Sequence, residues 1–169
     1  MFFRKSFQLK KFTLYILLLA IFGCKEDRAT RNPYLGEVHF NYSINLNFPL
    51  YNALRTPMNT VFVPYGGIKG FFVTYTGSGY YAWEAACPNH SINTCQRLHC
   101  ATKISNENLF ERCDDGDTVY SYLFVQCPCD YTVYSLVNGA PIAISGRERV
   151  YPLLYYTVSV AGDVLTISN

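Results

Sequence analysis

The chain contains two short loops rich in cysteine. The first reads Cys87-Pro88-Asn89-His90 and is followed by Cys95, and the second reads Cys127-Pro128-Cys129-Asp130. Each loop comes directly after a segment with the composition of a strand. Cysteine, histidine and aspartate ligate metals, and cysteines also pair as disulfides. The chemistry of this chain, if it has any, is therefore expected in these two loops.

Short strands separated by turns are predicted around the loops. From Glu37 to Leu46 apolar residues alternate with polar ones, which is the period of a half-buried strand. The same reasoning predicts strands over Thr60–Val63, Gly70–Tyr75, Tyr80–Glu84, Thr118–Gln126, Thr132–Leu136, Leu154–Val160 and Asp163–Ser168. No segment shows a sustained apolar period of 3.6 residues. This pattern predicts an all-β sandwich or barrel.

The loops and their flanking strands resemble the Rieske iron–sulfur domain. In that family one loop supplies a cysteine and a histidine ligand, and the other supplies Cys-Pro-x-His. Cytochrome bc-type members add one cysteine per loop, and these two form a disulfide. The resemblance extends over residues 37–169 through Gly67–Val73, Tyr80–Trp83, Tyr134–Leu136, Gly139–Pro141 and Pro152–Val158. It implies a Rieske-like antiparallel β-sandwich or barrel with a small two-loop cluster-binding subdomain.

The resemblance also assigns roles to the cysteines. Cys87 and Cys127 occupy the ligand-cysteine positions, and Cys95 and Cys129 occupy the positions that form the disulfide between the loops. The histidine ligands of the family are not both present. Asp130 stands at the second histidine position, and His90 lies one residue after the first histidine position. A [2Fe-2S] cluster here would use Cys87 and Cys127 on one iron and His90 and Asp130 on the other. A carboxylate ligand would add negative charge and lower the reduction potential.

Two alternatives use the same residues. Cys87 and Cys127 could form a disulfide across the loop tips, or a zinc ion could bind Cys87, His90, Cys127 and Asp130. Cys100 and Cys113, between the two loops, are expected to form a local disulfide that closes an insertion.

The N-terminus predicts export and a lipid anchor. A basic stretch, Met1–Lys11, precedes an apolar run over Phe12–Phe22, which is too short for a membrane span of about 20 residues and suits a signal peptide over 1–23. Ile21–Cys24 resembles a bacterial lipobox, so lipidation is expected at Cys24, with residues 24–36 as the lipidated N-terminus and tether. Lys25-Glu26-Asp27 resembles the export tag of Bacteroidetes surface lipoproteins. We expect a protein of the cell envelope, anchored in the outer membrane and facing the periplasm or the surface.

The route of export affects whether the protein can carry a cluster. Clusters cross membranes only in proteins that are already folded, by the twin-arginine route, and Arg4-Lys5 only partly resembles that signal. Six cysteines in an oxidising compartment favour disulfides instead. The leading hypothesis is therefore a binding or structural module without a cofactor. The alternative is an electron-transfer protein with an atypical [2Fe-2S] cluster.

Charge and motifs exclude other classes. After residue 23 the chain carries 10 basic and 12 acidic residues, a net charge of −2, with no basic cluster for nucleic acid. No arrangement of nucleophile, base and oxyanion donors is evident, so no enzymatic activity is expected. The expected partners are the membrane, through the anchor, and an envelope or redox protein.

Overall fold

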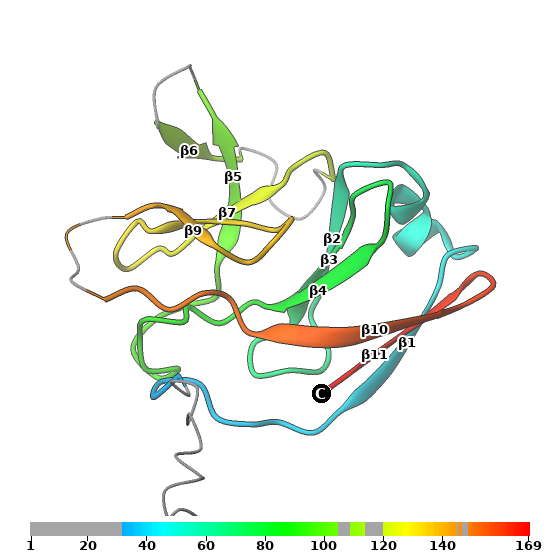
Figure 1. Ribbon diagram of the computed structural model, residues 1–169, viewed down its shortest axis with the longest axis horizontal. Coiled ribbons are helices and arrows are strands. Elements are labelled where there is room, and N and C mark those ends of the chain that lie inside the picture. The colour runs from blue at the N-terminus through cyan, green and yellow to red at the C-terminus, as the bar shows by residue number, and fades with distance from the viewer. Residues whose placement is uncertain (1–31, 105–108, 114–119, 145, 147–148) are drawn as a thin grey trace, which may run out of the picture. The chain divides into compact units, whose positions relative to one another are not determined.

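Two antiparallel β-sheets form the part of the chain that is described by the computed structural model (Figure 1). The described residues are 32–104, 109–113, 120–144, 146 and 149–169. The signal peptide, Cys24 and most of the expected tether lie outside them. Within this part of the chain, no helix is long and apolar enough to cross a membrane.

The larger sheet has six strands in the order β1-β11-β10-β4-β3-β2. Their bounds are β1 Asn41–Asn45, β2 Asn59–Val63, β3 Phe71–Tyr75, β4 Tyr80–Glu84, β10 Tyr155–Ala161 and β11 Val164–Ser168. A short 3-10 helix, η1 (Pro49–Arg55), connects β1 to β2. Every pairing in the sheet is antiparallel, and short turns or loops join β2 to β3, β3 to β4 and β10 to β11.

The smaller sheet has five strands in the order β6-β5-β7-β8-β9. Their bounds are β5 His99–Lys103, β6 Phe110–Arg112, β7 Phe124–Gln126, β8 Val133–Ser135 and β9 Pro141–Ala143. The first cysteine loop connects β4 of the larger sheet to β5 of the smaller one, and the second lies between β7 and β8. The expected all-β antiparallel fold with a small two-loop subdomain is thus confirmed.

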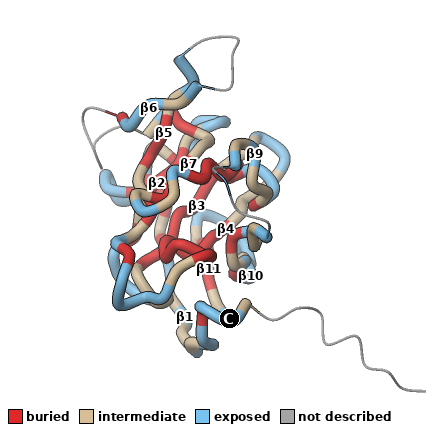
Figure 2. The backbone as a smooth tube through the Cα atoms, turned by 90° about the vertical axis from the view of Figure 1, so that its left-hand side faces the viewer, coloured by how far each residue is buried: buried red, intermediate tan, exposed pale blue. Residues whose placement is uncertain are grey.

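Two apolar cores lie on opposite faces of β3 and β4. Phe71 and Val73 belong to the core beneath η1, β1 and β11, whereas Phe72 and Trp83 belong to the core beneath the cysteine loops. Because both faces are covered, β3 is buried from Phe71 to Thr74 instead of alternating (Figure 2). Trp83 also donates its indole N–H to the carbonyl of Leu136, at 2.8 Å, which fixes β4 to the chain beyond β8.

The strand expected over Thr118–Gln126 is shorter in the structure, beginning at Phe124. The preceding residues form hydrogen bonds to β2 outside any regular ladder: the N–H of Thr60 donates to the Tyr120 carbonyl, at 2.7 Å, and its hydroxyl to the Tyr122 carbonyl, at 2.7 Å. The strand expected from Glu37 likewise begins only at Asn41. β5, β6, β9 and η1 were not predicted.

Candidate functional site at the two cysteine loops

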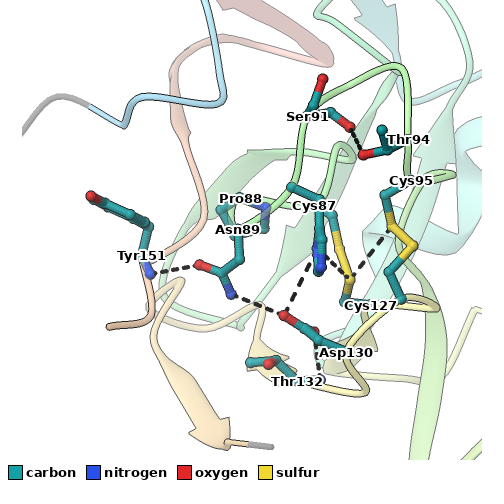
Figure 3. Close-up of polar contacts among 12 residues, drawn as sticks. Cys87, Pro88, Asn89, Ser91, Thr94, Cys95, Cys127, Asp130, Thr132 and Tyr151 are labelled. Carbon is teal, nitrogen blue, oxygen red and sulfur yellow. Dashed lines mark hydrogen bonds and ion pairs between the residues drawn. A yellow bond between two sulfur atoms is a disulfide. The ribbon is translucent and has the colours of Figure 1, made fainter. Parts of the chain in front are cut away.

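Local hydrogen bonds define both loops. An isolated bridge between Ala86 and Arg97 closes the first loop at its base. The second loop is a tight turn, since the N–H of Tyr131 donates to the Cys127 carbonyl, at 3.0 Å, and the N–H of Cys127 donates to the Thr132 carbonyl, at 2.9 Å. The cysteines of the two loops lie side by side (Figure 3).

Two disulfides join the loops. Cys87 is bonded to Cys127, with Cα atoms 5.8 Å apart, and Cys95 is bonded to Cys129, with Cα atoms 6.1 Å apart. Both separations fall in the range that disulfides require. The two disulfides are adjacent, because the sulfurs of Cys95 and Cys127 are 3.7 Å apart. The structure thus places a disulfide at the expected ligand-cysteine positions.

The third disulfide lies in the segment between the two loops. Cys100, on β5, is bonded to Cys113, just beyond β6, with Cα atoms 5.6 Å apart. It ties together the hairpin between the two loops.

His90 points at the disulfides. Its Nδ1 is 3.5 Å from the sulfur of Cys127 and 3.8 Å from Oδ2 of Asp130. Asp130 also serves its own turn, because its Oδ1 accepts the backbone N–H of Thr132, at 3.0 Å. Four donor atoms, from Cys87, His90, Cys95 and Cys127, all lie within 4.8 Å of one another. Asp130 is not in this group, and Cys95 is.

Asn89, at the usual position of the first histidine, fastens the loops together. It is 2% exposed, and its amide donates to the hydroxyl of Tyr134, at 2.7 Å. Its carbonyl oxygen accepts the N–H of Tyr151, at 2.9 Å, and its amide lies 3.5 Å from Oδ2 of Asp130 (Figure 3). The sequence alone does not reveal this role of Asn89, although an amide beside a proline in a loop offers this kind of hydrogen bonding.

Glu84 supports the first loop from below. It is fully buried at the end of β4, and its Oε1 accepts the N–H groups of Lys69 and Ala86, at 2.9 and 2.7 Å. Its Oε2 accepts the N–H of Ile68, at 2.7 Å, and the hydroxyl of Tyr156, at 2.5 Å. Burial, followed by the charge of Glu84, raises the pKa of Tyr156 above its usual value, so this phenol stays protonated. Glu84 thereby holds the turn before β3 against the start of the first loop.

The beginning of the described chain also contacts the first loop. The side-chain amide of Asn32 donates to the Pro88 carbonyl, at 2.7 Å, and the rings of Tyr34 and Tyr151 meet edge to face, with centroids 6.2 Å apart. The chain therefore enters the domain beside the cysteines.

The donors do not match a Rieske cluster. Such a cluster needs two imidazoles on one iron and two thiolates on the other. Of the three histidines in the sequence, His39 is exposed ahead of β1 and His99 lies on β5, so only His90 belongs to the loops. Its Nδ1 is also 3.5 Å from the sulfur of Cys127, a separation typical of two ligands on one ion. In a Rieske cluster the imidazole and thiolate ligands are on different irons.

Comparison with known proteins finds a likeness among solved structures. No family model matches the chain, and no curated protein matches it. Among solved structures, the ferredoxin of carbazole 1,9a-dioxygenase from Nocardioides aromaticivorans IC177 is similar, with 17% sequence identity and a TM-score of 0.41. The match covers 78% of this chain and 97% of that one. The fold described above rests on the strands and their registers.

Proposed function

We propose that this chain is a lipid-anchored envelope protein whose Rieske-like domain acts as a binding or structural module, not as an enzyme, and carries no iron–sulfur cluster. The observation that carries the proposal is the disulfide between Cys87 and Cys127. Both thiolates that would bind iron are used in that bond. The loops are thereby joined without a cofactor.

The surroundings support the same proposal. The side-chain nitrogen and oxygen of Asn89 both form hydrogen bonds within the protein, and Asp130 accepts a backbone N–H of its own turn. Asn89 stands where the Rieske family has its first histidine ligand, and Asp130 stands where it has its second. Their side chains therefore stabilise the loop geometry in the absence of a metal.

The N-terminal sequence supports the location. Ile21–Cys24 resembles a lipobox, and an exported chain meets an oxidising compartment in which disulfides persist. The partner we propose is another protein of the envelope, bound by a domain that the disulfides hold rigid.

The test is to purify the full chain from the envelope fraction and measure iron, zinc and free thiols together. We expect no metal and no free thiol, before or after unfolding in denaturant, and a colourless protein. A reddish-brown protein with two irons per chain, and with thiols appearing only on unfolding in acid, would overturn the proposal. That result would instead favour the electron-transfer protein, and Asp130→His would then be the informative variant.

A further inference from the structure

The donor atoms of Cys87, His90, Cys95 and Cys127 converge as the ligands of a single ion do. They come from both loops, and all four lie within 4.8 Å of one another. The three cysteines are 2, 5 and 0% exposed, in the order Cys87, Cys95 and Cys127. Once these three sulfurs are thiolates, they and the imidazole form a donor set that zinc prefers.

The distances between these atoms agree with a tetrahedral ion. Zinc binds sulfur at about 2.3 Å and nitrogen at about 2.0–2.1 Å, so two sulfurs on one tetrahedral zinc lie about 3.8 Å apart, and a sulfur and a nitrogen about 3.6 Å apart. Here the sulfurs of Cys95 and Cys127 are 3.7 Å apart. Nδ1 of His90 is 3.5 Å from the sulfur of Cys127. Two of the six edges of the tetrahedron thus already have the right length. A third, between Cys87 and Cys127, is a disulfide bond and has to lengthen on reduction.

We propose that reduction of the two inter-loop disulfides turns this group into a zinc site with Cys87, His90, Cys95 and Cys127 as ligands. The sequence had suggested Asp130 as the fourth ligand of a zinc site. In the structure Cys95 takes that place, while Asp130 accepts the N–H of Thr132. Thiolate is also the softer ligand, which zinc favours over carboxylate in closed structural sites.

The step balances with a dithiol as reductant. Each disulfide takes up two electrons and two protons and becomes two thiols, while each dithiol is oxidised to its own disulfide. Zinc then displaces the protons of Cys87, Cys95 and Cys127 and binds the neutral imidazole of His90. The fourth thiol, that of Cys129, is left over and is exposed in the structure.

The surroundings suit the charge of the product. Three thiolates around Zn²⁺ give a net charge of −1. The ammonium group of Lys69 lies beside this group, because its Nζ donates to the Cys95 carbonyl, at 2.6 Å. This positive charge lowers the cost of an anionic site at a buried position.

The experiment uses the full chain, reduced under nitrogen with a phosphine that does not compete strongly for zinc. Reduced protein titrated with ZnCl₂ against a chromophoric chelator is expected to bind one Zn²⁺ per chain, and oxidised protein none. Zinc should protect Cys87, Cys95 and Cys127 from alkylation but leave Cys129 reactive, as read by peptide mapping. Cobalt in place of zinc should give the charge-transfer and d–d bands of a tetrahedral thiolate site.

A matched pair of variants isolates Cys95. Cys95→Ser and Cys129→Ser abolish the same disulfide, but only Cys95→Ser removes a proposed ligand. We expect Cys129→Ser to bind zinc as reduced wild type does, and Cys95→Ser to bind it roughly a hundredfold or more weakly. Asp130→Asn should leave the affinity within about threefold of wild type.

Two results would overturn the inference: absence of zinc binding to the reduced protein, or equal affinity of Cys95→Ser and Cys129→Ser. A loss of binding in Asp130→Asn alone would return the fourth position to Asp130. If Cys95→Ser does not fold, X-ray absorption of zinc-loaded wild type decides between three sulfur neighbours and two. The inference fails separately from the proposed function, which concerns metal and thiols in the protein as isolated.

Discussion

At the scale of single residues, Glu84 is the clearest case of a charge that the fold needs. Its carboxylate accepts three backbone N–H groups and one phenol, so its burial is compensated on both oxygens. The turn that supplies two of these donors includes Gly67 at φ +66°, and a Cβ there would lie 2.6 Å from Oε2 of Glu84. Only glycine lets the backbone approach the carboxylate this closely.

Glu84→Gln is expected to lower the free energy of unfolding by about 2–4 kcal/mol. The amide nitrogen cannot accept a hydrogen bond, so at least one buried N–H loses its partner. Urea unfolding with the disulfides intact measures this. Tyr156→Phe removes one donor and leaves the carboxylate with three, so it should cost only about 1–2 kcal/mol. Equal losses in both variants would contradict the role of the backbone donors.

Tyr131 is held in a conformation that suits glycine. Its φ is +58°, and the residue is 67% exposed. A tyrosine in this left-handed region is strained by roughly 1–2 kcal/mol, part of which glycine gives back through its greater freedom in the unfolded chain. We therefore expect Tyr131→Gly to raise the free energy of unfolding by about 0.5–1 kcal/mol.

Tyr131→Ala is the control for this prediction, because it removes the ring and keeps the strained φ. Its stability should stay within about 0.5 kcal/mol of wild type. A Tyr131→Gly variant that is less stable than wild type would show that the exposed ring contributes packing.

At this scale the sequence indicates which residues come together in the loops, but not which bonds they form. The loop cysteines and His90 were singled out by type and spacing, and the structure brings them together. The roles of Asn89 and Glu84 were missed, because a hydrogen-bonding partner distant in the chain leaves no local pattern. The inclusion of Cys95 in the donor group depends on a 3.7 Å approach between two disulfides, which spacing cannot give.

At the scale of elements, the predictable strands were those whose pattern came from one buried face or a continuous apolar run. β4 was predicted with its observed bounds, and β2, β3 and β11 to within one residue at either end. β5 and β6 were missed because their sequences, HCATK and FER, carry little apolar alternation. β9 begins with Pro141, which is tolerated there because β9 is an edge strand.

The β5–β7 pair predicts a pH dependence. Burial, followed by the charge of Arg112, lowers the pKa of His99 below its usual 6.5, despite a hydrogen bond to Gln126. The unfolded chain therefore binds a proton that the folded one does not, and stability is lost as the pH falls through about 6.5. We expect His99→Gln to reduce the decrease in unfolding free energy between about pH 7.5 and about pH 5.

The control for this prediction is His39→Gln, at an exposed position ahead of β1. It should leave the decrease as it is in wild type. If His99→Gln and His39→Gln behave alike, the pH dependence has another origin.

At the scale of the whole molecule, the fold class followed from short strands and turns, whereas the division into two cores did not. That division depends on β3 and β4 being covered on both faces. The fold says even less about the function, because the cysteines and the histidine of the two loops are residue types that form disulfides or bind metals.

The proposed anchor is tested by Cys24→Ala in the full chain. We expect wild type to incorporate labelled palmitate and to fractionate with membranes, and Cys24→Ala to do neither. Fractionation of both proteins with membranes, without label, would contradict lipidation at this residue. The described domain is unchanged in this variant, so its thiol content serves as the control for folding.

The contact between Asn32 and Pro88 has a consequence for where such a protein can act. Cys24 precedes Asn32 by eight residues, which can span at most about 30 Å. If Cys24 carries the proposed lipid, the point where Asn32 contacts the first loop therefore stays within about that distance of the bilayer. A partner confined to the same bilayer would then meet the loops at a high effective concentration, so even a weak interface would be occupied.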